Sequence, residues 1–283
     1  MPFIFSYSIA SVMLEYLLLT QFPSFFHGQT MPHVALVPLT GFRVREAAML
    51  ELGMRLPGFR KRGEAIGQLP ALGLLTLAGM LPEAWSCSYH PAAQVTEEVL
   101  EQIAETQPTL VAVSALTASV GEAYRLAREM KERGIPTVLG GLHATACPEE
   151  GEEWFDSVAT GDGEPVWREL LWDASRGELK PRYTASAGVP EWTVPRFDLL
   201  GGEIPRWTLQ TQRGCPLACE FCGASRLLGS FREKPVEKIR EELSRIRKRD
   251  RTPLIELADD NTFAGEREWE EVFATFRKSG ARW

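Results

Sequence analysis

Apolar residues between positions 34 and 174 recur in two patterns, short continuous runs and stripes three or four residues apart. The runs predict buried strands at 34–37, 85–89, 110–116, 136–139 and 157–160. The stripes predict helices at 69–80, 99–103, 120–130 and 166–171. Thr96 is expected to cap the second of these helices, and Gly134 to follow the third. Regular alternation of strands and helices predicts an α/β fold with a Rossmann-like, doubly wound parallel sheet.

The pattern changes after residue 175. Pro181, Pro190, Pro195 and Pro205 interrupt it and predict a linker over 176–205. Beyond the linker, alternating strand and helix patterns return at 207–212, 236–246, 254–257 and 266–279. We therefore expect a first domain at 31–175 and a second domain at 206–283 that contains two strand–helix units.

Composition and charge narrow the class of protein. The chain has 283 residues, of which 44% are hydrophobic and 24% charged, enough for packed cores. A net charge of −7 argues against a nucleic-acid-binding protein, which needs a basic surface. The basic residues at 245–251 are interpreted as the solvated end of a helix, where cations complement the helix dipole.

The first thirty residues are mostly apolar from Phe3 to Leu19. A secretory signal needs a positive amino-terminal region, yet the first Lys or Arg is Arg43. Glu15 and the missing flanking cations also argue against a membrane span. We expect 1–30 to be a start codon assigned too early, with the domain opening at Met31, or a disordered extension. A membrane-associated segment is the alternative.

Three cysteines stand close together in the second domain. Cys215, Cys219 and Cys222 have the spacing C-x3-C-x2-C, with Phe221 directly before the last. Three thiolates on one loop can hold three irons of a [4Fe–4S] cluster and leave the fourth iron open to a substrate or cosubstrate. A structural zinc site is one alternative, but it needs a fourth ligand, and only distant residues such as Cys147 or His143 offer one. Inert buried thiols are the other.

The remaining cysteines bear on the cellular compartment. Cys87 and Cys147 are the only two left of five, so the chain has no disulfide framework. An oxygen-sensitive cluster also requires a reducing compartment. Both observations predict a cytoplasmic protein.

Small and polar residues follow three of the expected strands of the first domain. Ligands of open α/β sheets bind beyond the carboxyl ends of the strands. The residues that we expect to contact a cofactor there are Ser114, Leu116, Thr117, Gly140, Gly141, His143, Gly161, Gly163 and Glu164. The alternative is that the glycines only form tight turns.

The cysteine spacing, with Arg213 and Gly214 before it and Phe221 within it, resembles the signature of the radical S-adenosylmethionine (radical SAM) enzymes. The resemblance implies that the three cysteines bind the cluster, with Phe221 packed beside them. It also implies that the open iron binds the amino and carboxylate groups of SAM. An electron from the cluster would then cleave SAM to a 5′-deoxyadenosyl radical.

The first domain resembles the cobalamin (B12)-binding domain that precedes many radical SAM domains. Ser114-x-Leu116 and the pair Gly140-Gly141 carry this resemblance, which implies that they line the site of the cobalamin nucleotide tail. The segments 140–145 and 161–164 are typical of the form fused to a radical SAM domain. The D-x-H-x-x-G motif that supplies an axial histidine in other B12 proteins is missing after the first strand. Cobalt is then expected to bind without a histidine below it. His143 is interpreted as a pocket residue, or alternatively as a hydrogen-bonded turn histidine.

The second domain resembles the first two β/α units of the radical SAM partial barrel, which has six. The resemblance therefore implies an incomplete barrel, completed by a separate chain or truncated. Asp259 and Asp260, at one strand end, are expected to face SAM or substrate, or alternatively to cap a helix.

Two classes of function are compatible with these observations. The first is a cobalamin-dependent radical SAM enzyme that transfers a methyl group to, or rearranges, an unactivated carbon. Its expected partners are a small-molecule substrate, such as a lipid or natural-product intermediate, and a reductant such as flavodoxin or ferredoxin. The second is a non-catalytic cobalamin-binding module, with the partial barrel as a remnant.

Overall fold

The computed structural model describes residues 31–40, 47–57, 60, 63, 66–185, 192–217, 219–227 and 229–283. The expectations for residues 1–30 lie outside these ranges. Among the described residues, no helix combines the length and the apolar character that crossing a membrane requires.

The first domain is built on one six-stranded sheet with the order β2-β1-β3-β4-β5-β6, in which every neighbouring pair is parallel. Its strands are β1 (His33–Pro38), β2 (Ser86–Tyr89), β3 (Leu110–Ser114), β4 (Thr137–Gly140), β5 (Ser157–Thr160) and β6 (Arg182–Thr184). The strand order reverses between β1 and β3, which is the usual ligand position in doubly wound sheets. The predicted Rossmann-like α/β fold is confirmed.

Helices connect these strands. They are α2 (Ala47–Met54), α4 (Leu72–Gly79), α5 (Glu97–Glu105), α6 (Val120–Glu132), α7 (Leu142–Ala146), α8 (Pro148–Glu152) and α9 (Glu164–Arg176), with a 3-10 turn η1 (Thr117–Ser119) before α6. The side chain of Thr96 accepts a hydrogen bond from the Val99 N–H at the start of α5. Gly134 has a φ of +70° after α6. Both predicted helix ends are confirmed.

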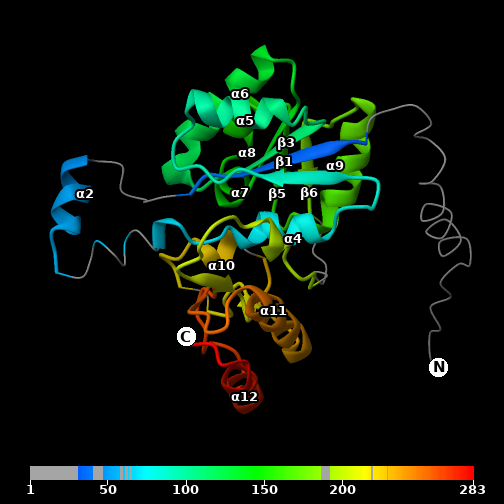
Figure 1. Ribbon diagram of the computed structural model, residues 1–283. Helices are drawn as coiled ribbons and strands as arrows, with labels where there is room; N and C mark the ends of the chain where they lie inside the picture. Colours follow the sequence, from blue (N-terminus) through cyan, green and yellow to red (C-terminus); the bar gives the residue numbers. More distant parts are fainter. Residues whose placement is uncertain are drawn as a thin grey trace, which may run out of the picture.

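Successive strand residues face opposite sides of the sheet, and helices cover both sides (Figure 1). On one side, Ala35 and Val37 pack with residues of α5, α6 and α7. On the other side, Val34 and Leu36 pack with residues of α4 and α9. The central strands are therefore buried on both faces, as their continuous apolar runs predict.

The second domain has its own core. Its elements are β7 (Trp207–Leu209), β8 (Gln212–Arg213), α10 (Ala224–Leu227), β9 (Arg232–Glu233), α11 (Val236–Arg249), β10 (Ile255–Leu257) and α12 (Trp269–Ser279). Strands β7 and β10 are parallel neighbours, and β8 pairs antiparallel with β9. The strand expected over 207–212 is interrupted after Leu209, because the backbone N–H of Thr211 donates to the Asp259 side chain.

Helix α4 belongs to both cores. Leu74 and Ala78 pack in the core of the first domain, whereas Leu75 packs with Phe197, Trp207 and the apolar faces of α11 and α12. In Figure 1, α4 runs between the sheet and the second domain. The segment 176–205 contributes strand β6 and the 3-10 turn η2 (Phe197–Leu199). The sequence does not predict β6, because three residues carry too little periodicity.

Candidate functional site: a strand-end cavity beside the cysteine loop

A cavity of about 690 Å³ lies at the carboxyl ends of the strands of the first domain. Residues that follow β1, β3, β4 and β5 form one side of it, and α4 forms another. Three residues of the second domain, Gln210, Arg213 and Ala258, also line it. The volume lies within the range of about 300–1,000 Å³ that is usual for small-molecule and cofactor sites.

Most of the residues expected to contact a cofactor line this cavity. They are Ser114, Leu116, Gly140, Gly141, Gly161, Gly163 and Glu164. Ser114 is half-buried at the end of β3, in the lining of the cavity. The individual contacts of these residues with a cofactor stay predictions.

Gly141 shows why β4 ends in glycines. Its φ of +94° and ψ of −170° lie in a region that is essentially restricted to glycine. A Cβ atom there would lie 3.0 Å from the Ser114 hydroxyl oxygen and 3.1 Å from the Ala115 carbonyl oxygen. Glycine therefore allows the chain after β4 to approach the end of β3 closely.

His143 and Thr117 lie outside the lining of the cavity. The His143 ring is buried, and its Nε2 and Nδ1 atoms lie 2.9 Å from the Tyr124 hydroxyl and 3.2 Å from the Thr117 hydroxyl, respectively. Both ring nitrogens thus have a partner within the protein, the arrangement of a hydrogen-bonded turn histidine. A contact of either residue with cobalamin stays a prediction.

Sequence reasoning missed the contribution of α4. Leu72, Gly73, Thr76 and Leu77 of this helix line the cavity. Its sequence LGLLTLAG has no charged residue. A helix that is apolar on all sides is buried on more than one side. The lack of charged residues in α4 is therefore the sequence signal from which its position between two cores could have been predicted.

The three cysteines lie in the cysteine loop, residues 214–231, which β8 and β9 close at its two ends. Gly214, with a φ of +74°, turns the chain into the loop. Cys215, Cys219 and Cys222 are half-buried, and the Cys222 N–H donates to the Cys219 carbonyl. Phe221 is 93% exposed, so its predicted packing beside a cluster stays a prediction.

The donor set of the loop fits a cluster. The three thiols stand between Cys215 and Cys222, and thiolates are the ligands that iron–sulfur clusters take. In a cluster, each thiolate binds a different iron, so the ligands need not converge on one point.

Asp259 and Asp260, at the end of β10, hold the chain that enters the loop. Asp259 Oδ1 accepts hydrogen bonds from the N–H groups of Thr211 at 2.7 Å and Gln212 at 3.2 Å, and Oδ2 accepts one from the Thr211 hydroxyl at 2.6 Å. Asp260 accepts a hydrogen bond from the Gly214 N–H. Contact of either carboxylate with SAM or substrate stays a prediction.

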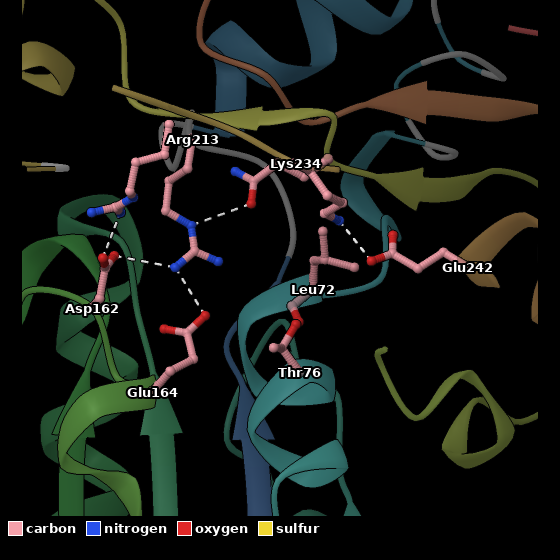
Figure 2. A network of polar contacts seen from close by, with 9 residues as sticks. Leu72, Thr76, Asp162, Glu164, Arg213, Lys234 and Glu242 are labelled. Carbon is pink, nitrogen blue, oxygen red and sulfur yellow. Dashed lines mark hydrogen bonds and ion pairs between the residues drawn. The ribbon is translucent and has the colours of Figure 1, made fainter. Parts of the chain in front are cut away.

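Figure 2 shows a network of charged side chains from Asp162 and Glu164 of the first domain and Arg213, Lys234 and Glu242 of the second. Arg213 Nη1 lies 2.9 Å from Glu164 Oε1 and 3.2 Å from Asp162 Oδ1. Lys234 Nζ lies 2.6 Å from Glu242 Oε1, and both of these side chains are almost fully buried. Burial lowers the pKa of Lys234 and raises the pKa of Glu242, and their mutual attraction opposes both changes.

The chain is similar to one protein-family model and to several known proteins. Residues 62–171 match the family model of the B12 binding domain. The chain is 28% identical to a bacteriochlorophyllide d C-12(1)-methyltransferase of Chlorobaculum tepidum over 62% of the chain and 41% of that protein. It is 24% identical to an anaerobic magnesium-protoporphyrin IX monomethyl ester cyclase of Cereibacter sphaeroides, over 80% of the chain and 44% of that protein.

A third relative acts on a different substrate class. The chain is 27% identical to a hopanoid C-2 methylase of Rhodopseudomonas palustris, over 70% of the chain and 38% of that protein. The chain thus spans less than half the length of each of these three relatives. The matched model shows a B12-binding domain in this chain, and the three-cysteine loop and these relatives make the chain similar to the B12-binding-domain-containing radical SAM proteins.

Proposed function

We propose that this chain binds cobalamin in the strand-end cavity and a [4Fe–4S] cluster with SAM at the cysteine loop. The reaction proposed is methyl transfer to, or rearrangement of, an unactivated carbon. The observation that carries the proposal is the composition of the cavity wall, which includes Gln210 and Arg213 immediately before the cysteine loop. A cofactor in the cavity would therefore contact the domain that holds the cluster.

Different residues of the chain would bind the cluster and cobalamin. The thiolates of Cys215, Cys219 and Cys222 would bind three irons and leave the fourth open to SAM. Small residues at the strand ends and the apolar residues of α4 would enclose cobalamin and exclude water, and the Ser114 hydroxyl would offer it a hydrogen bond. When bound, the cluster supplies the electron that cleaves SAM, and cobalamin carries the methyl group.

The partners follow from the same proposal. Relatives named for bacteriochlorophyllide, magnesium-protoporphyrin and hopanoid substrates support a small-molecule substrate, either a lipid or a natural-product intermediate. A flavodoxin or ferredoxin would supply electrons. A reducing compartment, the cytoplasm, would suit an oxygen-sensitive cluster.

Anaerobic reconstitution of the full chain tests the proposal. The enzyme hypothesis predicts cobalamin binding, thiolate-to-iron charge-transfer absorption, and reductive cleavage of SAM to 5′-deoxyadenosine. Cobalamin binding without SAM cleavage would instead identify a non-catalytic cobalamin-binding module. Absence of cobalamin binding would contradict both hypotheses.

A further inference from the structure

One carboxylate of the first domain binds both ends of the cysteine loop. Asp162 follows β5, and its Oδ1 accepts a hydrogen bond from Arg213 Nη1 at 3.2 Å. Its Oδ2 accepts one from Arg232 Nη2 at 2.5 Å. Arg213 in β8 and Arg232 in β9 are direct partners in the antiparallel pair that closes the loop. We call these three residues the Asp162 bridge.

The bridge is largely shielded from water. The exposed side-chain fractions are 18% for Asp162, 13% for Arg213 and 14% for Arg232. Glu164, 7% exposed, adds a second carboxylate beside Arg213, so two positive and two negative charges balance. Charge-assisted hydrogen bonds between shielded groups are strong, and loss of one partner leaves an uncompensated charge.

Other groups fix the position of the Arg213 guanidinium. Glu164 is the first residue of α9, where the helix dipole favours a negative charge. The guanidinium also lies over the ring of Trp192, at 5.4 Å from the centroid, and its Nε donates to Gln210 Oε1. Figure 2 shows Arg213 extending from the second domain toward Asp162 and Glu164. These contacts give the guanidinium one defined orientation.

The bridge lies between the two candidate cofactor sites. Asp162, Glu164 and Arg213 all line the strand-end cavity, and Cys215 follows Arg213 by two residues. We propose that Asp162, supported by Glu164, is a positioning residue that fixes the cysteine loop at the cavity and couples the two sites. The identity of the two cofactors rests on the proposed function, whereas the bridge rests on geometry alone.

Coupling between the cavity and the cysteine loop predicts an effect of a bound ligand that an ion pair with only a stabilising role would not produce. If the bridge links the sites, a ligand in the cavity slows backbone opening in the loop, because coupling between sites is a shared free energy. Hydroxocobalamin should then slow amide hydrogen exchange in residues 214–231. In the variant Asp162→Asn, compared with the unmodified chain at a hydroxocobalamin concentration that saturates each protein, this added protection should be lost.

Hydrogen-exchange mass spectrometry of the full chain, with and without hydroxocobalamin, tests the proposal. In the cofactor-free chain, Asp162→Asn should speed exchange in the loop about tenfold or more, because it removes a charged acceptor shared by two donors. The matched control is Glu178→Gln, which removes the charge of an exposed pair with Arg176 at the end of α9. The control should leave exchange in the loop unchanged.

Two results would overturn the proposal. The first is that the amide hydrogens of the loop exchange equally fast in Asp162→Asn and in the unmodified chain. The second is that hydroxocobalamin slows this exchange to the same extent in Asp162→Asn and in the unmodified chain. If Asp162→Asn does not fold, Arg232→Gln, which keeps the Asp162–Arg213 contact, is judged by the same two criteria. A chain that binds no hydroxocobalamin contradicts the proposed function, yet exchange in the cofactor-free chain still tests the bridge.

Discussion

The Asp259 carboxylate binds Thr211 twice, through the Thr211 backbone N–H at 2.7 Å and through its hydroxyl at 2.6 Å. These bonds join the end of β10 to the chain that leads into the cysteine loop. The contact ends β7 and directs the chain toward Gly214. The loop is therefore held from within the second domain as well as by the Asp162 bridge.

Substitution of Asp259 should destabilise this domain. We expect Asp259→Asn to lower the free energy of unfolding by about 1–3 kcal/mol, because several donors lose a charged acceptor. Urea denaturation measures the change. Glu270→Gln, in an exposed pair with Arg277, is the control and should change stability by less than about 0.5 kcal/mol. Equal stability of the two variants would contradict this role of Asp259.

Gly141 should tolerate no side chain. We expect Gly141→Ala to lower the free energy of unfolding by about 1–3 kcal/mol, since alanine must adopt a conformation suited to glycine. It should also weaken cobalamin binding, measured by titration of visible absorbance, because the ends of β3 and β4 would move apart. Gly121→Ala is the matched control, because nothing lies within 4 Å of its added Cβ in α6. That control should stabilise the helix by about 0.5–1 kcal/mol. Wild-type affinity in Gly141→Ala would show that this close approach does not shape the site.

Two histidines should make stability depend on pH. His33 Nε2 and His90 Nε2 both lie within hydrogen-bond distance of the Ser88 hydroxyl, at 2.9 and 2.8 Å. Burial lowers the pKa of both, and the charge of His33 lowers that of His90 further. The unfolded chain therefore binds more protons below the ordinary pKa of 6.5, and folding stability decreases as pH falls.

Urea denaturation from about pH 7.5 to about pH 5.5 measures this dependence. Each histidine can contribute a slope of at most about 1.4 kcal/mol per pH unit. The double variant His33→Asn/His90→Asn should show a flatter profile than the wild type over this range. An unchanged profile would mean that neither histidine is the source.

The cysteines of the loop should differ from the other two in metal binding. Cys215→Ala, Cys219→Ala and Cys222→Ala should each lose the thiolate-to-iron absorption after anaerobic reconstitution, because each removes one ligand. Cys87→Ala and Cys147→Ala, outside the loop, should keep it. Equal iron content in all five variants would place the metal elsewhere.

Local sequence patterns predicted the sheet well. The apolar runs that became β1, β3 and β5 are continuous, and Thr96 and Gly134 mark ends of helices between these strands. Strand-end residues such as Ser114 and Gly141 were predictable because carboxyl ends of parallel strands share one edge. Their contacts come from the topology, which the strand–helix alternation determines.

Contacts between distant segments were not predictable in the same way. Asp162 lies 51 residues from Arg213 and 70 from Arg232, and no periodicity connects them. The Asp259 contact with Thr211 spans 48 residues, so the polar cluster at the β10 end fitted a ligand site or a helix cap equally well. The first set of contacts depends on how the two domains pack and the second on how β7 and β10 pair, and the local pattern encodes neither.

The central claim is that three thiolates hold a cluster with one iron open to SAM. The most direct measurement is metal analysis of the oxygen-protected, reconstituted chain, followed by electron paramagnetic resonance of its reduced form with and without SAM. We predict about four irons per chain, as a cubane requires, and a spectrum that changes when SAM binds. Zinc at these thiols, no bound metal, or an iron spectrum that SAM leaves unchanged would contradict the claim.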